Sequence, residues 1–169
     1  MVIVITGPES SGKSQLSEAL SAQLGIPIMH EYARKFLESK GGGTYDKDDI
    51  KHIARNQMVE SLTFNRRYSS WVMDTDVLTS IIWIEDKYGP APEWMTDAFI
   101  EPPYDCCYLL CYPDVPWEAD DLREDEHRRE ELYEVYLTWL KKFNKKYFLI
   151  KGDDRTEQAL MHLKDVQDY

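Results

Sequence analysis

Near its start the chain reads Gly7-Pro8-Glu9-Ser10-Ser11-Gly12-Lys13-Ser14, which matches the pattern GxxxxGK[ST]. Residues 2–5, just before it, form an unbroken β-branched run that is typical of a parallel strand buried on both faces. After it, Leu16, Leu20 and Leu24 recur at helical spacing until Gly25. A strand, a glycine-rich turn and a helix in this order predict a phosphate-binding loop.

The residue types in this loop suit a nucleotide phosphate. Glycines let the backbone approach the phosphates, and the helix N-terminus aims N–H groups at them. Lys13 adds a cation, and the Ser14 hydroxyl is a ligand for Mg²⁺. A glycine-rich turn with a purely structural role is the alternative. The sequence therefore predicts binding of ATP with Mg²⁺ by Gly7, Pro8, Glu9, Ser10, Ser11, Gly12, Lys13 and Ser14.

The remaining chain alternates short apolar runs with helical patterns. Further strands are expected at 28–32, 71–74, 106–112 and 147–150. A helix capped by Asp46 is expected to turn these residues inward: Ile50, Ile53, Ala54, Met58 and Leu62. This alternation predicts an α/β fold with a five-stranded parallel sheet between layers of helices. The 169 residues fit one domain.

Three carboxylates lie at or just after the ends of predicted strands. The carboxyl edge of an open parallel sheet is where ligands bind. Asp74 and Asp76 share a face at strand spacing, so at least one is expected to enter the site, the alternative being a helix cap. Glu31 is a candidate to accept the proton of an attacking hydroxyl, the alternative being a salt bridge to Arg34.

Charge is unevenly distributed along the chain. Twenty Lys and Arg against 31 Asp and Glu give a net charge of −11, which argues against nucleic acid and acidic membranes as partners. Within 85–134, sixteen acids face four bases. Arg123, Arg128 and Arg129 lie there, and we expect them to face phosphate from a mobile lid at about 115–131. Pairing with neighbouring acids is the alternative.

Other residues narrow the cellular setting. Cys106, Cys107 and Cys111 form neither a zinc spacing nor a disulfide framework, which favours a reducing compartment. No apolar run approaches the roughly 18 residues of a membrane span, and no signal-peptide pattern opens the chain. A cytoplasmic protein is expected, and a homo-oligomer is compatible with the sequence. The aromatic residues that either stack on a planar ligand or fill the core are Trp83, Trp94 and Tyr88.

Taken together, four stretches resemble the nicotinamide riboside kinase domain of NadR-type NAD-biosynthesis proteins. They are GPESSGKS at 7–14, HEYAR at 30–34, MDTD at 73–76 and YPDVPWEADDLR at 112–123. The resemblance covers nearly the whole chain, and its E-Y-x-R, D-T-D and W-x-x-D-x-x-R elements are more specific than the loop. Residues 120–123 read Asp-Asp-Leu-Arg where family members often have Asp-Gly-Leu-Arg.

The resemblance implies a P-loop kinase of the nucleoside monophosphate kinase type with a lid. It would transfer the γ-phosphoryl group of ATP to the 5′-hydroxyl of nicotinamide riboside and give nicotinamide mononucleotide. The implied catalytic residues are Lys13, Glu31, Asp74, Arg123 and Arg128. The implied substrate ligands are Glu31, Tyr32, Asp74 and Asp76, with Ser14 and Asp74 on the metal and Gly152 and Arg155 at the adenine.

Two other functions stay open from the sequence. The same core supports a kinase for another nucleoside or a small alcohol, because acceptor choice depends on variable loops. A non-kinase ATP-binding regulator or ATPase, with the acidic segment contacting another protein, is the second. At this length the chain is expected to carry the kinase step alone.

Overall fold

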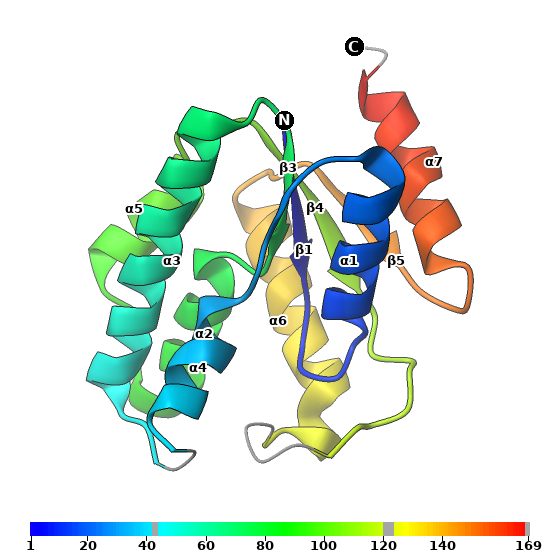
Figure 1. Cartoon of the computed structure of the whole chain (residues 1–169). Helices are drawn as coiled ribbons and strands as arrows, with labels where there is room; N and C mark the ends of the chain where they lie inside the picture. The colour runs from blue at the N-terminus through cyan, green and yellow to red at the C-terminus, as the bar shows by residue number, and fades with distance from the viewer. Residues whose placement is uncertain (42–43, 120–123, 168–169) are drawn as a thin grey trace.

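The computed structural model describes residues 1–41, 44–119 and 124–167, the last three by their backbone alone (Figure 1). The strands are β1 (Val2–Thr6), β2 (Ile28–Met29), β3 (Trp71–Asp74), β4 (Cys106–Cys111) and β5 (Tyr147–Ile150). The helices are α1 (Lys13–Leu24), α2 (Tyr32–Ser39), α3 (Lys47–Arg67), α4 (Val77–Tyr88), α5 (Glu93–Ile100), the 3-10 helix η1 (Glu126–Arg128), α6 (Arg129–Lys142) and α7 (Arg155–Gln167).

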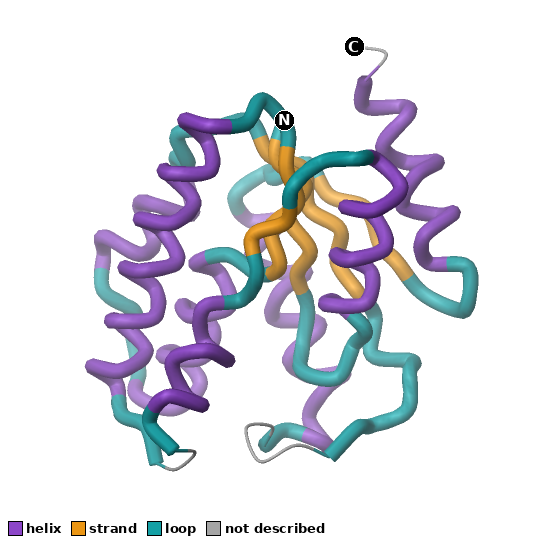
Figure 2. The backbone as a smooth tube through the Cα atoms, in the orientation of Figure 1, coloured by secondary structure: helices purple, strands orange, loops and turns teal. Residues whose placement is uncertain are grey.

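The strands form one sheet in the order β2-β3-β1-β4-β5, and every pair is parallel. The central strand is β1, whose Val2 is in register with Trp71 of β3 and Cys106 of β4. The predicted α/β class with a five-stranded parallel sheet is confirmed. Because all strands run in one direction, their carboxyl ends meet at one edge, where the loops 7–12 and 112–119 lie side by side (Figure 2).

Both faces of the sheet are buried, as a parallel sheet requires. Alternate residues of β1 divide between the faces: Ile3 and Ile5 pack with α1 and α7, whereas Val2 and Val4 pack with helices α3 to α6. Figure 1 shows α1 and α7 together on one side of the sheet. The unbroken apolar sequence of β1 is therefore explained by two cores that share one strand.

Helix α3 begins where its sequence predicts. The Asp46 side chain accepts hydrogen bonds from the backbone of Asp48 and Asp49, and Asp49 completes a capping box. Ile50, Ile53 and Ala54 are buried and Met58 is partly buried, but Leu62 is 40% exposed, so the prediction that Leu62 turns inward was wrong. In the described part of the chain, no helix combines the length and apolar composition needed to cross a bilayer.

Two short helices differ from the sequence-based expectation. The strand expected at 28–32 stops at Met29, because Glu31 becomes the N-cap of α2 and Tyr32 begins that helix. Helix α5 was not anticipated at all. It is only eight residues long and buries just two side chains, Met95 and Phe99, which is too few for a clear helical pattern. The cysteines are core thiols as expected: all three are free, and only Cys106 is not fully buried.

The loop after β1 passes directly over the end of β4. Gly7 has φ +138°, and a Cβ there would lie 2.7 Å from the carbonyl oxygen of Cys111. Gly25, which ends α1, has φ +64°, but a Cβ there would have no other atom within 4 Å. Both glycines have a positive φ that side chains disfavour, and of the two only Gly7 adds a collision with backbone.

We expect Gly7→Ala to lower the free energy of unfolding by about 3 kcal/mol, because backbone strain and the collision with Cys111 add together. Gly25→Ala is the matched control and should cost only about 1–2 kcal/mol, from its left-handed backbone alone. Urea denaturation of both variants measures the difference. Equal losses would show that the close approach to β4 does not constrain the loop.

The corner between β3 and α4 holds a buried carboxylate. Asp76 is the N-cap of α4, and it accepts hydrogen bonds from the Leu78 N–H at 3.2 Å and the Tyr108 hydroxyl at 2.8 Å. Burial raises the pKa of Asp76 from 3.8 to about 6, against the opposing effect of the two hydrogen bonds. Folding therefore favours the protonated form of this side chain between those two pH values.

Stability should depend on pH through Asp76. Between pH 4 and 6 the unfolded state has released this proton while the folded state retains it, so the free energy of unfolding falls as pH rises and then levels off. The contribution is about 3 kcal/mol, at about 1.4 kcal/mol per pKa unit. Denaturation of wild type and Asp76→Asn across this range tests it: the difference between them should shrink or reverse towards pH 7, and parallel curves would contradict the shift.

Candidate active site

The glycine-rich loop joins β1 to α1 and leaves helix amides open. Gly12 is the N-cap of α1 and has no side chain to bond the first-turn N–H groups. Inside the loop, the Ser11 hydroxyl donates to the Pro8 carbonyl at 2.8 Å, and the Lys13 ammonium donates to the same carbonyl at 2.7 Å. The ammonium is thus folded back over the loop, next to the open amides, which together form a binding site for an anion.

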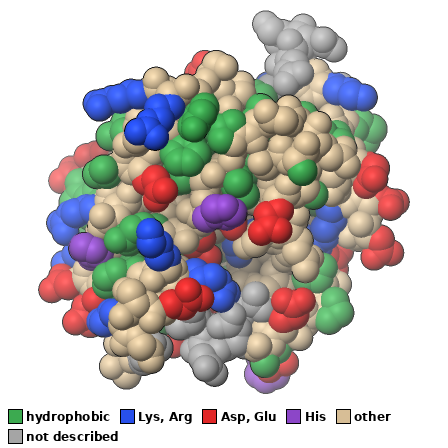
Figure 3. All heavy atoms as spheres, viewed as in Figure 1, with side chains coloured by type: hydrophobic (Ala, Val, Ile, Leu, Met, Phe, Trp, Pro, Cys, Tyr) green, Lys and Arg blue, Asp and Glu red, His purple; other side chains and the backbone are tan. Residues whose placement is uncertain are grey.

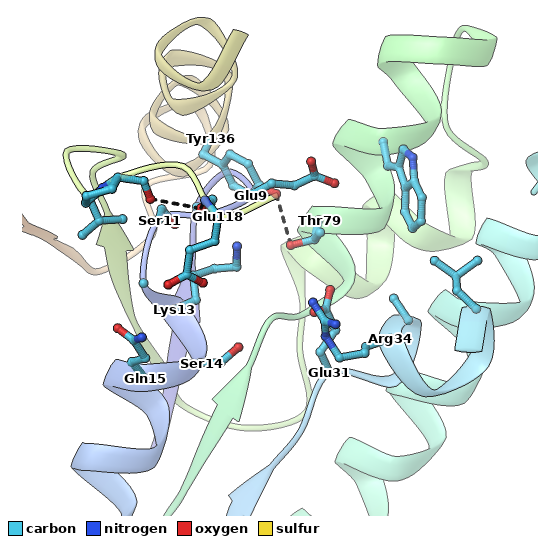
Figure 4. A pocket seen from close by; sticks show the side chains of 18 residues that line it. Glu9, Ser11, Lys13, Ser14, Gln15, Glu31, Arg34, Thr79, Glu118 and Tyr136 are labelled. Atoms are coloured by element: carbon cyan, nitrogen blue, oxygen red, sulfur yellow. Dashed lines mark hydrogen bonds between the residues drawn. The ribbon is translucent and has the colours of Figure 1, made fainter. Parts of the chain in front are cut away.

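A cavity of about 430 Å³ opens in front of this loop. Figure 3 shows charged side chains of both signs around a hollow on this face of the molecule. Lys13 and Ser14 line one side, and Glu31 and Arg34 lie opposite them across the cavity (Figure 4). A volume of about 430 Å³ is within the usual range of small-molecule binding sites.

Asp74 ends β3 beside the glycine-rich loop, where it shares a hydrogen bond with Ser14, and it is not itself among the residues that line the cavity. Its side chain is buried, and its Oδ1 has no hydrogen-bond partner among the described residues. Burial raises the pKa of Asp74, while a hydrogen bond from Ser14 and the charge of Lys13 oppose that rise. A buried carboxylate oxygen without a partner is costly.

This arrangement fits Mg²⁺. The ion takes oxygen ligands, usually from one or two carboxylates together with phosphates and water. The Ser14 hydroxyl and the Asp74 carboxylate are hard oxygen donors beside the loop, and the ion or its water would satisfy Asp74 Oδ1. No group of three or more His, Cys, Asp or Glu able to hold a metal occurs in the described ranges.

Glu31 enters the cavity from the end of β2. It caps α2 without a side-chain hydrogen bond to that helix, and its carboxylate lines the cavity. Burial raises the pKa of Glu31, the Lys13 charge lowers it, and the nearby Asp74 raises it again. The structure therefore brings Lys13, Asp74 and Glu31 within electrostatic reach of one another. Arg34, the alternative partner of Glu31, forms an ion pair with Glu38 at 3.9 Å, and its charge also lowers the pKa of Glu31.

The far half of the cavity is lined by Trp83, which the sequence offered for ring stacking, and by three residues that the sequence did not single out: Leu37, Thr79 and Tyr136. The Tyr136 hydroxyl donates to Thr79 Oγ1 at 3.2 Å, and both residues line the cavity with Leu37 and Trp83. In the sequence, Tyr136 is spaced like the core residues Leu132 and Leu140 of the same helix. A hydrophobic pattern therefore could not distinguish a cavity-lining tyrosine from a core residue. Of the three aromatic residues weighed for ring stacking, Trp83 lines this cavity, whereas Trp94 and Tyr88 do not.

The segment expected to form a lid contacts the loop through Arg129 rather than Arg128. Arg129 Nη1 donates to the carbonyl oxygens of Ser10 at 3.0 Å and Val115 at 2.9 Å. Arg128 instead pairs with Asp86 through two hydrogen bonds of 2.9 and 2.6 Å and does not line the cavity. The structure thus places Arg128 in a surface ion pair, and a phosphate-facing role for Arg128 stays a prediction.

The side chains of Glu9 and Ser10 also join that segment to the loop. The Glu9 carboxylate accepts from the backbone N–H groups of Glu124 at 2.9 Å and Asp125 at 3.3 Å. The Ser10 hydroxyl accepts from the Glu118 N–H at 3.0 Å. Arg123 lies outside the described residues, and the mobility of the lid stays a prediction.

Arg155 supports the loop from behind. It is 8% exposed, and its guanidinium donates to the Ser11 carbonyl at 2.6 Å, to the Tyr112 carbonyl at 2.8 Å and to Asp114. The Gly152 N–H donates to Asp114 Oδ2 at 2.6 Å. Neither Gly152 nor Arg155 lines the cavity, so the structure gives Arg155 a loop-holding contact, and adenine binding by this turn stays a prediction.

Two predicted substrate ligands are not brought to the cavity. The Tyr32 ring stacks on Phe36 with centroids 6.3 Å apart, away from the lining. Asp76 lines a second cavity of about 200 Å³ with Tyr108. Asp74 and Asp76 do not share a face, because Thr75 between them has φ +65° and breaks the strand alternation. The helix-cap alternative for Asp76 is the one that the structure supports.

Similarity to known proteins agrees with this geometry. Over 98% of its length the chain is 25% identical to the trifunctional NAD biosynthesis/regulator protein NadR of Escherichia coli (strain K12). It spans only 42% of that relative. This similarity confirms the resemblance to NadR-type proteins that the motifs indicate.

Solved structures share the fold. A NadR protein in complex with NR matches with a TM-score of 0.76 at 18% identity, covering 97% of this chain and 50% of that one. A deoxyadenosine kinase from M. mycoides, with products bound, matches with a TM-score of 0.70 at 16% identity, covering all of both chains.

The family model described as an AAA domain matches residues 2–157, a span that contains the glycine-rich loop, all five strands and the cavity in front of the loop. The chain belongs to this AAA domain family.

Proposed function

We propose that this chain is an ATP-dependent kinase that phosphorylates the 5′-hydroxyl of nicotinamide riboside and gives nicotinamide mononucleotide. The observation that carries the proposal is the placement of Glu31 across one cavity from Lys13 and Ser14, with Asp74 hydrogen-bonded to Ser14 beside the loop. A phosphate cradle and a carboxylate with raised pKa face each other, as transfer from a nucleotide to a hydroxyl requires.

The residues divide the chemistry between them. The loop amides and Lys13 hold the triphosphate, and Ser14 with Asp74 would hold Mg²⁺. The bound ion neutralises phosphate charge. Glu31 accepts the proton of the acceptor hydroxyl while the hydroxyl oxygen bonds to the γ-phosphorus, the bond from that phosphorus to the bridging oxygen breaks, and ADP leaves.

The acceptor end of the proposal has its own support. Trp83, Leu37 and Tyr136 give the far half of the cavity an apolar, partly aromatic wall that suits a planar ring. The similarity to NadR favours nicotinamide riboside. The deoxyadenosine kinase that covers the whole chain favours another nucleoside as the second candidate. A single cytoplasmic domain with a lid at about 115–131 belongs to the same proposal.

Purified protein with Mg²⁺ and ATP should release ADP only when an acceptor is present, fastest with nicotinamide riboside. Lys13→Ala should lower kcat/KM for ATP by about 100-fold or more, because it removes the ammonium over the loop. Lys51→Ala, whose ammonium pairs with Asp48 far from the loop, is the matched control and should match wild type.

Each other result of that assay has a meaning. If deoxyadenosine turns over faster than nicotinamide riboside, the proposed acceptor is wrong and the proposed kinase activity is retained. Equal ADP release with and without every acceptor would favour the ATPase or regulator. If Lys13→Ala has the same rate as wild type, the glycine-rich loop is not the ATP-binding site.

The two carboxylates should separate by their kinetics. Glu31→Gln should lower kcat by about 100- to 10,000-fold with little change in KM for ATP, because it removes the proton acceptor. Asp74→Asn should raise the Mg²⁺ concentration needed for half-maximal rate by about 10- to 100-fold. If instead Glu31→Gln raises the Mg²⁺ requirement and Asp74→Asn lowers kcat, Asp74 is the base and Glu31 the metal ligand.

The pH profile checks the same assignment. A base must be ionised, and burial raises the pKa of Glu31 above its usual 4.5. As pH falls, wild-type kcat should therefore decline at a higher pH than an ordinary glutamate would allow. This acidic decline should be absent from the residual activity of Glu31→Gln.

A further inference from the structure

The two strand ends that carry the candidate carboxylates are joined by one buried amide. Gln57 of α3 is 5% exposed, and it lies between the start of α2 and the corner after β3. Its Oε1 accepts from the Tyr32 N–H at 2.9 Å, and its Nε2 donates to the Thr75 carbonyl at 2.8 Å. The backbone partners fix the orientation of this amide, because one is only a donor and the other only an acceptor.

Both partners are next to residues of the candidate site. Tyr32 directly follows Glu31, which caps α2 without any side-chain bond of its own to that helix. Thr75 directly follows Asp74. Strands β2 and β3 pair through Ile28–Val72 and Met29–Met73. The ladder between these two strands therefore ends before either carboxylate. Beyond that point, the two hydrogen bonds of Gln57 link the two backbones.

Thr75 is also strained. It is a buried β-branched residue with φ +65°, a conformation that such residues rarely adopt. Strain of this kind persists where surrounding contacts hold it in place. The Thr75 N–H donates to the Ile5 carbonyl at 3.0 Å, and its own carbonyl is held by Gln57. This turn directs Asp74 to the loop and Asp76 to the second cavity.

We propose that Gln57 is a positioning residue that sets the spacing between Glu31 and Asp74. It touches neither ATP nor acceptor and acts through the backbone on both sides of the cavity. Its kinetic consequence rests on the proposed function, because only a transfer reaction needs the base and the metal ligand in register. A misplacement of about 1 Å between reacting groups costs on the order of 100-fold in rate.

Two variants test whether the hydrogen bonds of Gln57 to Tyr32 and Thr75 position the two carboxylates. Gln57→Met keeps length and shape but bonds neither Tyr32 nor Thr75, and Gln57→Asn keeps the amide but is too short to bridge both. We expect kcat to fall by about 10- to 100-fold in each, with affinity for Mg²⁺ and a non-hydrolysable ATP analogue within about twofold of wild type by calorimetry. The matched control is Asn56→Ala on the same helix, whose amide donates to the His52 carbonyl at 2.8 Å.

A readout independent of activity separates this inference from the proposed function. The Tyr32 amide proton should exchange with solvent at least about tenfold faster in Gln57→Met, measured by NMR, and unchanged in Asn56→Ala. An unchanged exchange rate of the Tyr32 amide would overturn the positioning role of Gln57, even if the wild-type protein is inactive with every acceptor. A fall of kcat and analogue affinity together would also overturn it, because it would indicate general loosening. If Gln57→Met does not fold, the same criteria apply to Gln57→Asn.

Discussion

The glycine-rich loop depends on a close approach between its own backbone at Gly7 and the backbone at the end of β4. Gly7 leaves β1 with φ +138°, and its Cα is so close to the Cys111 carbonyl that no side chain fits. That approach keeps the loop low over the sheet edge, where Arg155 holds the Ser11 carbonyl and Arg129 holds the Ser10 carbonyl. The amides at the start of α1 then face a cavity whose other wall is built from the neighbouring strand ends. The site therefore depends on sheet geometry before it depends on any charged residue.

Much of this framework could be predicted from sequence because it follows from local patterns. An unbroken β-branched run, a glycine-rich turn and leucines at helical spacing define β1, the loop and α1, and five such runs in alternation with helices define the parallel sheet. The short helices were harder. Helix α2 starts within two residues of a strand and α5 buries only Met95 and Phe99, so tertiary contacts rather than periodicity decide both.

The site was predictable to the level of strand ends and not to the level of side-chain direction. Parallel strands bring Glu31 and Asp74 to one edge whatever their rotamers are. Strand alternation then wrongly grouped Asp74 with Asp76, because it assumes extended backbone and Thr75 is left-handed. Likewise, Arg128 and Arg129 are adjacent where η1 meets α6, and only the helix phase decides that Arg129 meets the loop while Arg128 meets Asp86. Gln57 had no sequence pattern, since both its partners are backbone groups from distant segments.

A protein with net charge −11 that binds a polyanion has to solve an electrostatic problem locally. Glu9 and Glu31 line the cavity and Asp74 lies within electrostatic reach of Lys13 and Glu31, and burial raises the pKa of all three carboxyl groups, so the site already disfavours negative charge. More lysines would attract phosphate, but they would also pair with Glu31 and weaken it as a proton acceptor. Open amides at a helix N-terminus attract an anion without a full positive charge. In our proposal the remaining repulsion is cancelled by the cation that the nucleotide brings with it, which makes the metal-bearing nucleotide, and not the bare triphosphate, the species that this cavity fits.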